Sequence, residues 1–173
     1  MQKTFSIIIV LTVLILVGCA EVDLSEAKTS ISSKNLSPAT NTSEFRGTAG
    51  DSVELVDAKV TLDVTEVEDG QAHFYNTTLP DGDPVYFFVV KSPDGSLRAA
   101  ANGCQVCGGA LQGFRQEGDF MVCNTCGNRY PLDKIATEKG GCNPAPINPD
   151  LKIEDGKISI SLTELKNIKH FFE

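Results

Sequence analysis

The chain has 173 residues, with 15 basic against 23 acidic side chains and a formal net charge of −8. This balance argues against nucleic acid or an anionic lipid surface as a partner, because both require positive charge. The sequence shows no internal repeat, no Gly-rich phosphate loop, and no Ser-His-Asp set or carboxylate pair of the kind that catalyses hydrolysis. We therefore do not expect an enzyme.

The first residues have the pattern of a secretory signal. A short basic start is followed by the apolar run 5–17, which is shorter than the roughly 20 residues of a membrane-spanning helix. The run ends in Leu-Val-Gly-Cys at residues 16–19, which resembles the lipobox of prokaryotic lipoproteins. We expect residues 1–18 to be a signal peptide and Cys19 to carry a lipid that holds the protein at the extracytoplasmic face of the cell membrane. An uncleaved anchor is the alternative.

The segment after the signal is predicted to be a linker. Residues 19–50 are rich in Ser, Thr, Asn and Ala, with few large apolar groups. This composition cannot bury enough apolar surface to offset the entropy lost on ordering. We predict a flexible, lipid-anchored linker that lifts the domain off the membrane. Residues 51–173 are enough chain for one core and are predicted to form one domain.

Strand patterns occupy the first half of this domain. Apolar and polar residues alternate over 58–67, which predicts a strand with one face in water. A turn at Glu68-Asp69-Gly70 leads into residues 71–76, interpreted as the return strand. The continuous apolar run at 85–91 is typical of a buried central strand. After a further turn, residues 97–101 lead into a first pair of cysteines.

The C-terminal part predicts a hairpin and a short helix. Asp155-Gly156, a strong hairpin signal, separates residues 151–154 from 157–162. Ser161 and Glu164 have the spacing of a helix capping box, and the apolar residues that follow recur on one side of a helix. The predicted fold is an all-β domain with minor helix.

Between these parts lie two Cys-x-x-Cys pairs, about 15 residues apart, close to the ligand spacing of a four-thiolate metal site. The four residues are Cys104, Cys107, Cys123 and Cys126. A glycine follows each pair and relieves the crowding of a tight turn. Glu117-Gly118 predicts a hairpin turn that brings the pairs face to face. We predict that the four thiolates hold a metal ion or an iron-sulfur cluster.

Disulfides are the alternative, because thiols oxidise outside the cytoplasm. A bond within a Cys-x-x-Cys pair closes only a tiny loop and adds little stability, and crosslinks between the pairs would not require a glycine behind each one. The paired spacing therefore favours a metal. A thiol-disulfide oxidoreductase is disfavoured, because no βαβ pattern precedes either pair.

Five further side chains are candidates for a role at the site. Cys142, the fifth thiol of the domain, is interpreted as a spare ligand, a ligand to a second metal, a redox-active thiol, or a buried small residue. His73 and His170 lack the companion that metal-binding histidines usually have. Arg115 and Arg129 flank the cysteine pairs, but solvent-facing positions on the hairpin explain them more simply.

Three stretches resemble the FtrD-like family of membrane iron-sulfur proteins, which are associated with bacterial and archaeal ferrous-iron uptake systems. They are residues 87–95, 114–127 and 139–147, within a resemblance that spans roughly 73–160. The resemblance implies an iron-sulfur cofactor and membrane partner proteins that carry out redox chemistry or iron transport.

A second, weaker resemblance is to Rieske ferredoxins. Residues 127–132, 141–146 and 153–160 occupy the places of the Rieske aromatic-Leu segment, proline loop and final hairpin. A Rieske site has histidine as the second ligand of each pair, whereas this chain has Cys107 and Cys126. The resemblance therefore implies a Rieske-like antiparallel β domain with an inserted two-knuckle metal subdomain of rubredoxin or zinc-ribbon type.

Two functional hypotheses follow. The first is a membrane-anchored, extracytoplasmic iron-sulfur protein with four cysteine ligands, which transfers electrons or handles metal for iron uptake. The second is a structural zinc-ribbon module of an envelope complex. Tetrahedral sulfur accepts both iron and zinc, so the cysteines alone do not decide between them.

Overall fold

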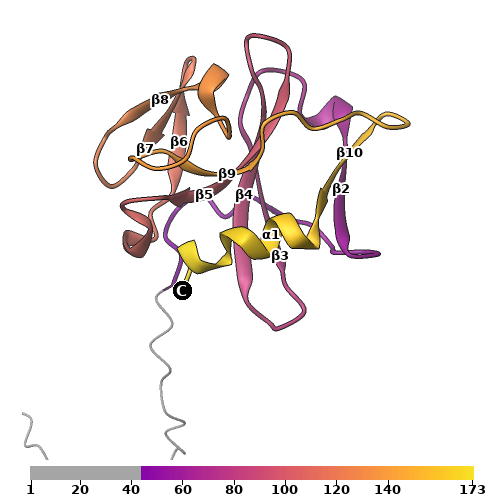
Figure 1. Ribbon diagram of the computed structural model, residues 1–173, viewed down its shortest axis with the longest axis horizontal. Helices are drawn as coiled ribbons and strands as arrows, with labels where there is room; N and C mark the ends of the chain where they lie inside the picture. Colours follow the sequence, from indigo (N-terminus) through magenta and orange to yellow (C-terminus); the bar gives the residue numbers. More distant parts are fainter. Residues whose placement is uncertain (1–43) are drawn as a thin grey trace, which may run out of the picture. The chain divides into compact units, whose positions relative to one another are not determined.

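The computed structural model describes residues 44–173, which form a mainly β fold with one short α-helix (Figure 1). This confirms the predicted fold class. A five-stranded sheet has the order β1-β3-β4-β5-β9, in which β1 and β3 are parallel and the other neighbours antiparallel. Its strands are β1 (Asp51–Ser52), β3 (His73–Thr78), β4 (Pro84–Lys91), β5 (Leu97–Cys104) and β9 (Pro144–Asn148).

Two smaller sheets flank the central one (Figure 1). The first pairs β2 (Lys59–Asp63) with β10 (Lys157–Ser161), and the second has the order β6 (Phe114–Glu117), β7 (Phe120–Cys123), β8 (Arg129–Pro131). Helix α1 spans Leu162–Ile168, and single 3-10 turns are η1 (Val64–Glu66), η2 (Gly108–Ala110), η3 (Leu132–Lys134) and η4 (Lys169–Phe171). Within residues 44–173, no helix is long and apolar enough to cross a membrane.

Strand β4 separates two hydrophobic cores, because successive side chains of a strand point to opposite faces. Val85, Phe87 and Val89 lie in one buried cluster, the first core. Phe88 and Val90 lie in another, the second core. The continuous apolar run that predicted a buried central strand is thus explained by burial on both faces.

The first core is covered by the β2–β10 pair and by α1. Buried aliphatic side chains alternate along both strands, and α1 adds two more; these are Val60, Leu62, Ile158, Ile160, Leu165 and Ile168. The helix begins with the predicted capping box, in which Ser161 Oγ accepts from Glu164 N while a Glu164 oxygen accepts from Ser161 N. The cap satisfies backbone groups that a short helix otherwise leaves open.

One predicted strand pairing was wrong, and another is present only at its turn. Strand β2 ends at Asp63 and pairs with β10, with Lys157 opposite Asp63, and not with the segment that follows it. Asp155 and Gly156 form the predicted turn, both with positive φ. The segment before that turn, however, meets β10 only at a single bridge from Glu154. Alternation fixes which face of a strand is buried but carries no information about its partner.

The last residues of the predicted linker contact the domain. The Phe45 ring stacks on Tyr86 at a centroid distance of 4.0 Å, Arg46 N donates to Leu111 O at 2.8 Å, and Asn102 Nδ2 donates to Thr48 O at 2.8 Å. The predicted signal peptide, the lipidation site Cys19 and most of the linker lie outside the described residues.

Candidate metal centre

The first cysteine pair lies where β5 leaves the central sheet. All eight residues of β5 are buried, and its last residue, Cys104, belongs to the second core. The chain then turns through Gln105 and the exposed Val106 to Cys107. Cys107 N donates to Cys104 Sγ at 3.3 Å. Hydrogen bonds from N–H groups to sulfur are one of the features that tune metal–sulfur sites, so this turn is suited to hold a metal ligand.

The second pair lies at the end of β7, in the same core. The predicted turn at Gly118, with a φ of 57°, joins β6 to β7. Strand β7 ends at the buried Cys123. The chain turns at Gly127, whose N–H donates to Cys123 O at 2.9 Å and whose φ is 74°. Such a φ is strained for any residue with a Cβ, which explains the glycine behind this pair.

A buried asparagine joins the two pairs. Asn102 is fully buried on β5, two residues before the first cysteine, and its Oδ1 accepts from Phe114 N at 2.7 Å. Because Phe114 begins β6, this bond fixes the β6–β7 hairpin against β5. A Cβ on the neighbouring Gly113 would lie 2.5 Å from Asn102 Oδ1. This close approach requires glycine there.

The third segment of the site is the loop of residues 140–143, which places Cys142 between the two pairs. Gln105 holds the loop from the first pair, because its Oε1 accepts from Gly140 N at 2.8 Å and its Nε2 donates to Asn143 Oδ1 at 2.6 Å. Asn128 holds it from the second pair through a 2.8 Å bond from its Nδ2 to Cys142 O. The loop is therefore attached to both halves of the site.

Five sulfurs meet at this point. The sulfurs of Cys104, Cys107, Cys123 and Cys142 all lie within 4.8 Å of one another. Cys142 Sγ is 3.3 Å from Cys104 Sγ, 3.8 Å from Cys107 Sγ and 2.8 Å from Cys126 Sγ. All five cysteines of the described chain are free thiols. Cys142, whose role the sequence left open, thus lies inside the site. Cys126 lies at the exposed edge of the site and outside the set of four.

The surroundings separate the pKa values of three thiols. Burial raises the pKa of Cys107 to about 11 and raises the pKa of Cys142 far above the ordinary range, with neighbouring thiols adding to the effect. The hydrogen bond with Cys142, followed by the Asn128 backbone N–H, lowers the pKa of the exposed Cys126 to about 7. Of these three thiols, Cys126 ionises most readily, and the thiolate is the form that binds metal.

The donor set fits a thiophilic metal. Four soft sulfur ligands converging from three chain segments are typical of zinc or iron-sulfur sites. Cys104 and Cys123 are buried and the other members of the set are half-buried, so the set is largely enclosed. The residues present can therefore hold either metal.

The histidines and arginines lie outside the set. His73 Nε2 is 2.8 Å from Asp69 Oδ1, and the His170 ring packs on Phe171. Arg115 and Arg129 both pair with Glu117 on the surface of the hairpin. These ion pairs lower the pKa of Glu117, the Arg115 contact most. The simpler interpretation of both arginines, as hairpin surface residues, agrees with these contacts.

Sequence reasoning missed the residues that position the site. Asn102, Gln105 and Asn128 act through hydrogen bonds to backbone or to another amide. A polar side chain between or beside cysteines carries no pattern that distinguishes it from a solvated one. Only its burial or its bonds reveal its role.

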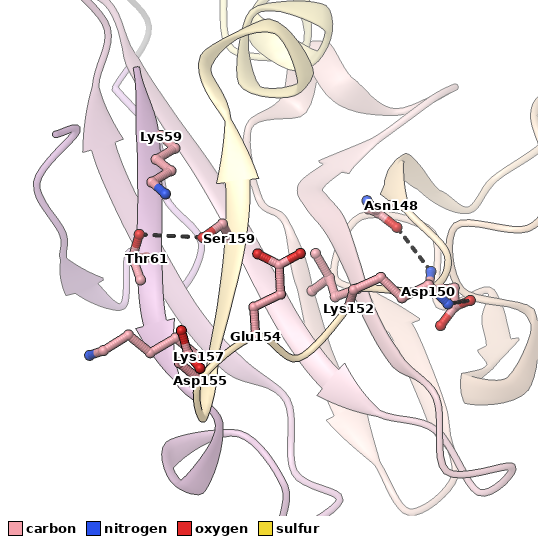
Figure 2. A pocket seen from close by; sticks show the side chains of 10 residues that line it. Lys59, Thr61, Asn148, Asp150, Lys152, Glu154, Asp155, Lys157 and Ser159 are labelled. Carbon is pink, nitrogen blue, oxygen red and sulfur yellow. Dashed lines mark hydrogen bonds and ion pairs between the residues drawn. The ribbon is translucent and has the colours of Figure 1, made fainter. Parts of the chain in front are cut away.

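A separate hollow lies between the β2–β10 pair and the loop before β10 (Figure 2). Its charged lining consists of Lys59, Lys152, Lys157, Asp150, Glu154 and Asp155. Figure 2 shows lysines and carboxylates on both sides of the hollow. Because the charges are mixed, the lining favours neither an anion nor a cation, and it includes no cysteine.

A family model described as "Membrane iron-sulfur containing protein FtrD-like" matches residues 67–172, more than half of the chain and all five described cysteines. This confirms the resemblance to that family. No curated protein matches the sequence. Among solved structures, the crystal structure of the quaternary ammonium Rieske monooxygenase CntA in complex with an inhibitor is similar, with 17% identity and a TM-score of 0.38. The match covers 66% of this chain and 32% of that one.

Proposed function

The chain belongs to the FtrD-like family of membrane iron-sulfur containing proteins, and from this premise we propose that it transfers electrons or handles metal at the outer face of the cell membrane in support of iron uptake. The observation that carries the proposal is the convergence of cysteine sulfurs from three segments of the chain within 4.8 Å. A carrier, and not an enzyme, is the role that this donor set supports.

The arrangement of the site supports a redox role. Bound iron supplies a one-electron couple, whose potential depends on ligand charge, on hydrogen bonds to sulfur and on solvent exposure. The chain contributes buried sulfurs at Cys104 and Cys123 and an N–H bond to Cys104 Sγ. The edge of the site faces solvent at Cys126 and at Val106, which is 67% exposed. A redox or iron-transport protein of the membrane is the partner that we propose for this edge.

The position at the membrane is part of the proposal. A lipid on Cys19, after removal of residues 1–18, would hold the domain at the extracytoplasmic face. Mass spectrometry of the mature N-terminus is the test, and we expect a chain that begins at lipidated Cys19. A mature chain that retains residues 1–18 would contradict lipidation and indicate an uncleaved anchor.

The structural zinc module remains the alternative, because the same four sulfurs suit a closed tetrahedral zinc site. The deciding experiment uses full-length protein extracted anaerobically from membranes. We expect bound iron and a visible absorption band that bleaches on reduction and returns on oxidation. One equivalent of zinc with no redox wave would overturn the redox proposal in favour of the zinc module.

A further inference from the structure

The distances among the sulfurs bear on how many metal ions the site holds. A tetrahedral ion with metal–sulfur bonds of about 2.3 Å has its ligand sulfurs about 3.8 Å apart. The sulfurs of Cys104, Cys107, Cys123 and Cys142 lie within 4.8 Å of one another, and Cys142 Sγ is 3.3 Å from Cys104 Sγ and 3.8 Å from Cys107 Sγ. One ion therefore fits among them. A [2Fe–2S] or [4Fe–4S] cluster distributes its four cysteines over two or four irons, which spreads the sulfurs more widely.

The fifth sulfur does not fit as a separate ligand. Cys126 Sγ lies 2.8 Å from Cys142 Sγ, which is well below the separation of about 3.8 Å between two ligands of one tetrahedral ion. Cys142 Sγ lies in the set of four, and Cys126 Sγ lies beside it but outside that set, so the two sulfurs are alternatives for a single corner of the tetrahedron. The other three corners belong to sulfurs fixed by the ends of β5 and β7 and by the first turn.

The two sulfurs that meet at this corner are held differently. Cys142 is half-buried on a loop whose place depends on Gln105 and Asn128. Cys126 is exposed and belongs to the second pair itself, one residue before Gly127, where the chain turns. One candidate therefore approaches the corner from inside the site and the other from the solvent edge.

We infer that the site holds a single metal ion on three fixed thiolates, Cys104, Cys107 and Cys123, and that its fourth ligand is supplied by either Cys142 or Cys126. This inference rests on the proposed function to the extent that the cysteines bind metal. It narrows the cofactor to one ion without inorganic sulfide. It also gives the site an exposed thiol, Cys126, that can take the place of Cys142 while the ion keeps four ligands. Such an exchange of ligands would let a metal enter or leave the site at its solvent edge.

The first test measures metal and acid-labile sulfide in full-length protein purified anaerobically from membranes. We expect one metal ion per chain and no sulfide. Two or more irons with an equal amount of sulfide would overturn the single-ion site and leave the iron protein of the proposed function intact. One zinc per chain would keep the single-ion site and overturn the redox function. Correctly folded protein that binds no metal would overturn both.

The second test uses serine variants challenged with a chelator. Cys126→Ser and Cys142→Ser should each retain about one ion per chain, because the remaining thiol fills the corner. The double variant should lose its metal under the same challenge, as should Cys123→Ser. Circular dichroism checks that each variant is folded. Loss of metal from either single variant to the extent seen in the double variant would overturn the shared corner, as would retention by the double variant.

Gln105 provides a third test, because it positions only one of the two thiols. In a Cys126→Ser background the corner depends on the Cys142 loop, so Gln105→Ala should release metal about 10-fold faster. In a Cys142→Ser background the same change should leave the rate unaltered. Equal acceleration in both backgrounds would mean that Gln105 supports the whole site and would contradict a role in placing Cys142.

Discussion

The two cores on either side of β4 differ in the side chains that fill them. The first core contains branched aliphatic side chains on β2, β10 and α1, and burial of such groups stabilises it without help. The second core includes Cys104 and Cys123 and is closed by strands of three or four residues. Phe88, Phe114 and Met121 are fully buried there as well, but the turns that close this core carry the cysteines. We therefore expect the stability of this half of the domain to depend in part on what the sulfurs bind. The comparison predicts that the first core is stable without metal and that metal binding adds stability to the second.

Loss of a fixed ligand should give the largest difference in amide protection between the two cores. Cys104→Ser is expected to release metal, because folding and metal binding are coupled in such sites, with apparent binding free energies of about 10–16 kcal/mol for zinc-finger peptides. Amide exchange should then accelerate in β6, β7 and β8, while β2, β10 and α1 stay protected. Cys126→Ser is the matched control and should keep both cores protected. Equal loss of protection in both cores would show that they fold as one unit.

Truncation of one large side chain in each core sharpens the comparison. Leu165 and Met121 are both fully buried, and replacement of either by alanine should lower the free energy of unfolding by about 2–5 kcal/mol. Only Met121→Ala should also speed the loss of metal to a chelator, because Met121 packs in the same cluster as Cys104 and Cys123. Urea unfolding and chelator kinetics measure the two effects. Faster metal loss from Leu165→Ala would show that the first core also supports the metal site, which would contradict this prediction.

Asn102→Ala tests the link between the sheet and the hairpin. The change leaves the buried Phe114 N–H without its acceptor, which should cost about 1–3 kcal/mol. The partly exposed Asn124, which donates to Gln112 O, provides a control, and Asn124→Ala should cost less. Chemical unfolding of the metal-loaded proteins gives both values. Equal free energies of unfolding for the two variants would contradict a role for Asn102 in linking the sheet to the hairpin.

The smallest effect is expected at the helix cap over the first core. Ser161→Ala removes the hydroxyl that accepts from Glu164 N, which should cost about 1 kcal/mol. Metal content should not change, because the cap serves the first core alone. The thermal midpoint and the metal content of the purified variant measure the two quantities. Depletion of metal in this variant would mean that the helix supports the site.

Much of the fold followed from local pattern. The run at 85–91, the Asp155-Gly156 turn and the Ser161–Glu164 cap were all predicted and confirmed. Strand partners were not, because β2 pairs with a strand more than ninety residues further along the chain. A two-residue period specifies a buried face for each strand, and several partners can satisfy the same face.

The metal site likewise has features that the sequence predicted and features that only the tertiary structure decided. Two Cys-x-x-Cys pairs, each followed by a glycine, predicted a metal site from spacing alone, because a tight turn places two sulfurs on one side of an ion. The place of Cys142 was decided by tertiary structure, through hydrogen bonds that Gln105 and Asn128 form with its loop and that hold it between the pairs. Ligand type and local spacing are properties of the sequence. Which thiol reaches the fourth corner depends on how separate segments pack, and that is a property of the fold.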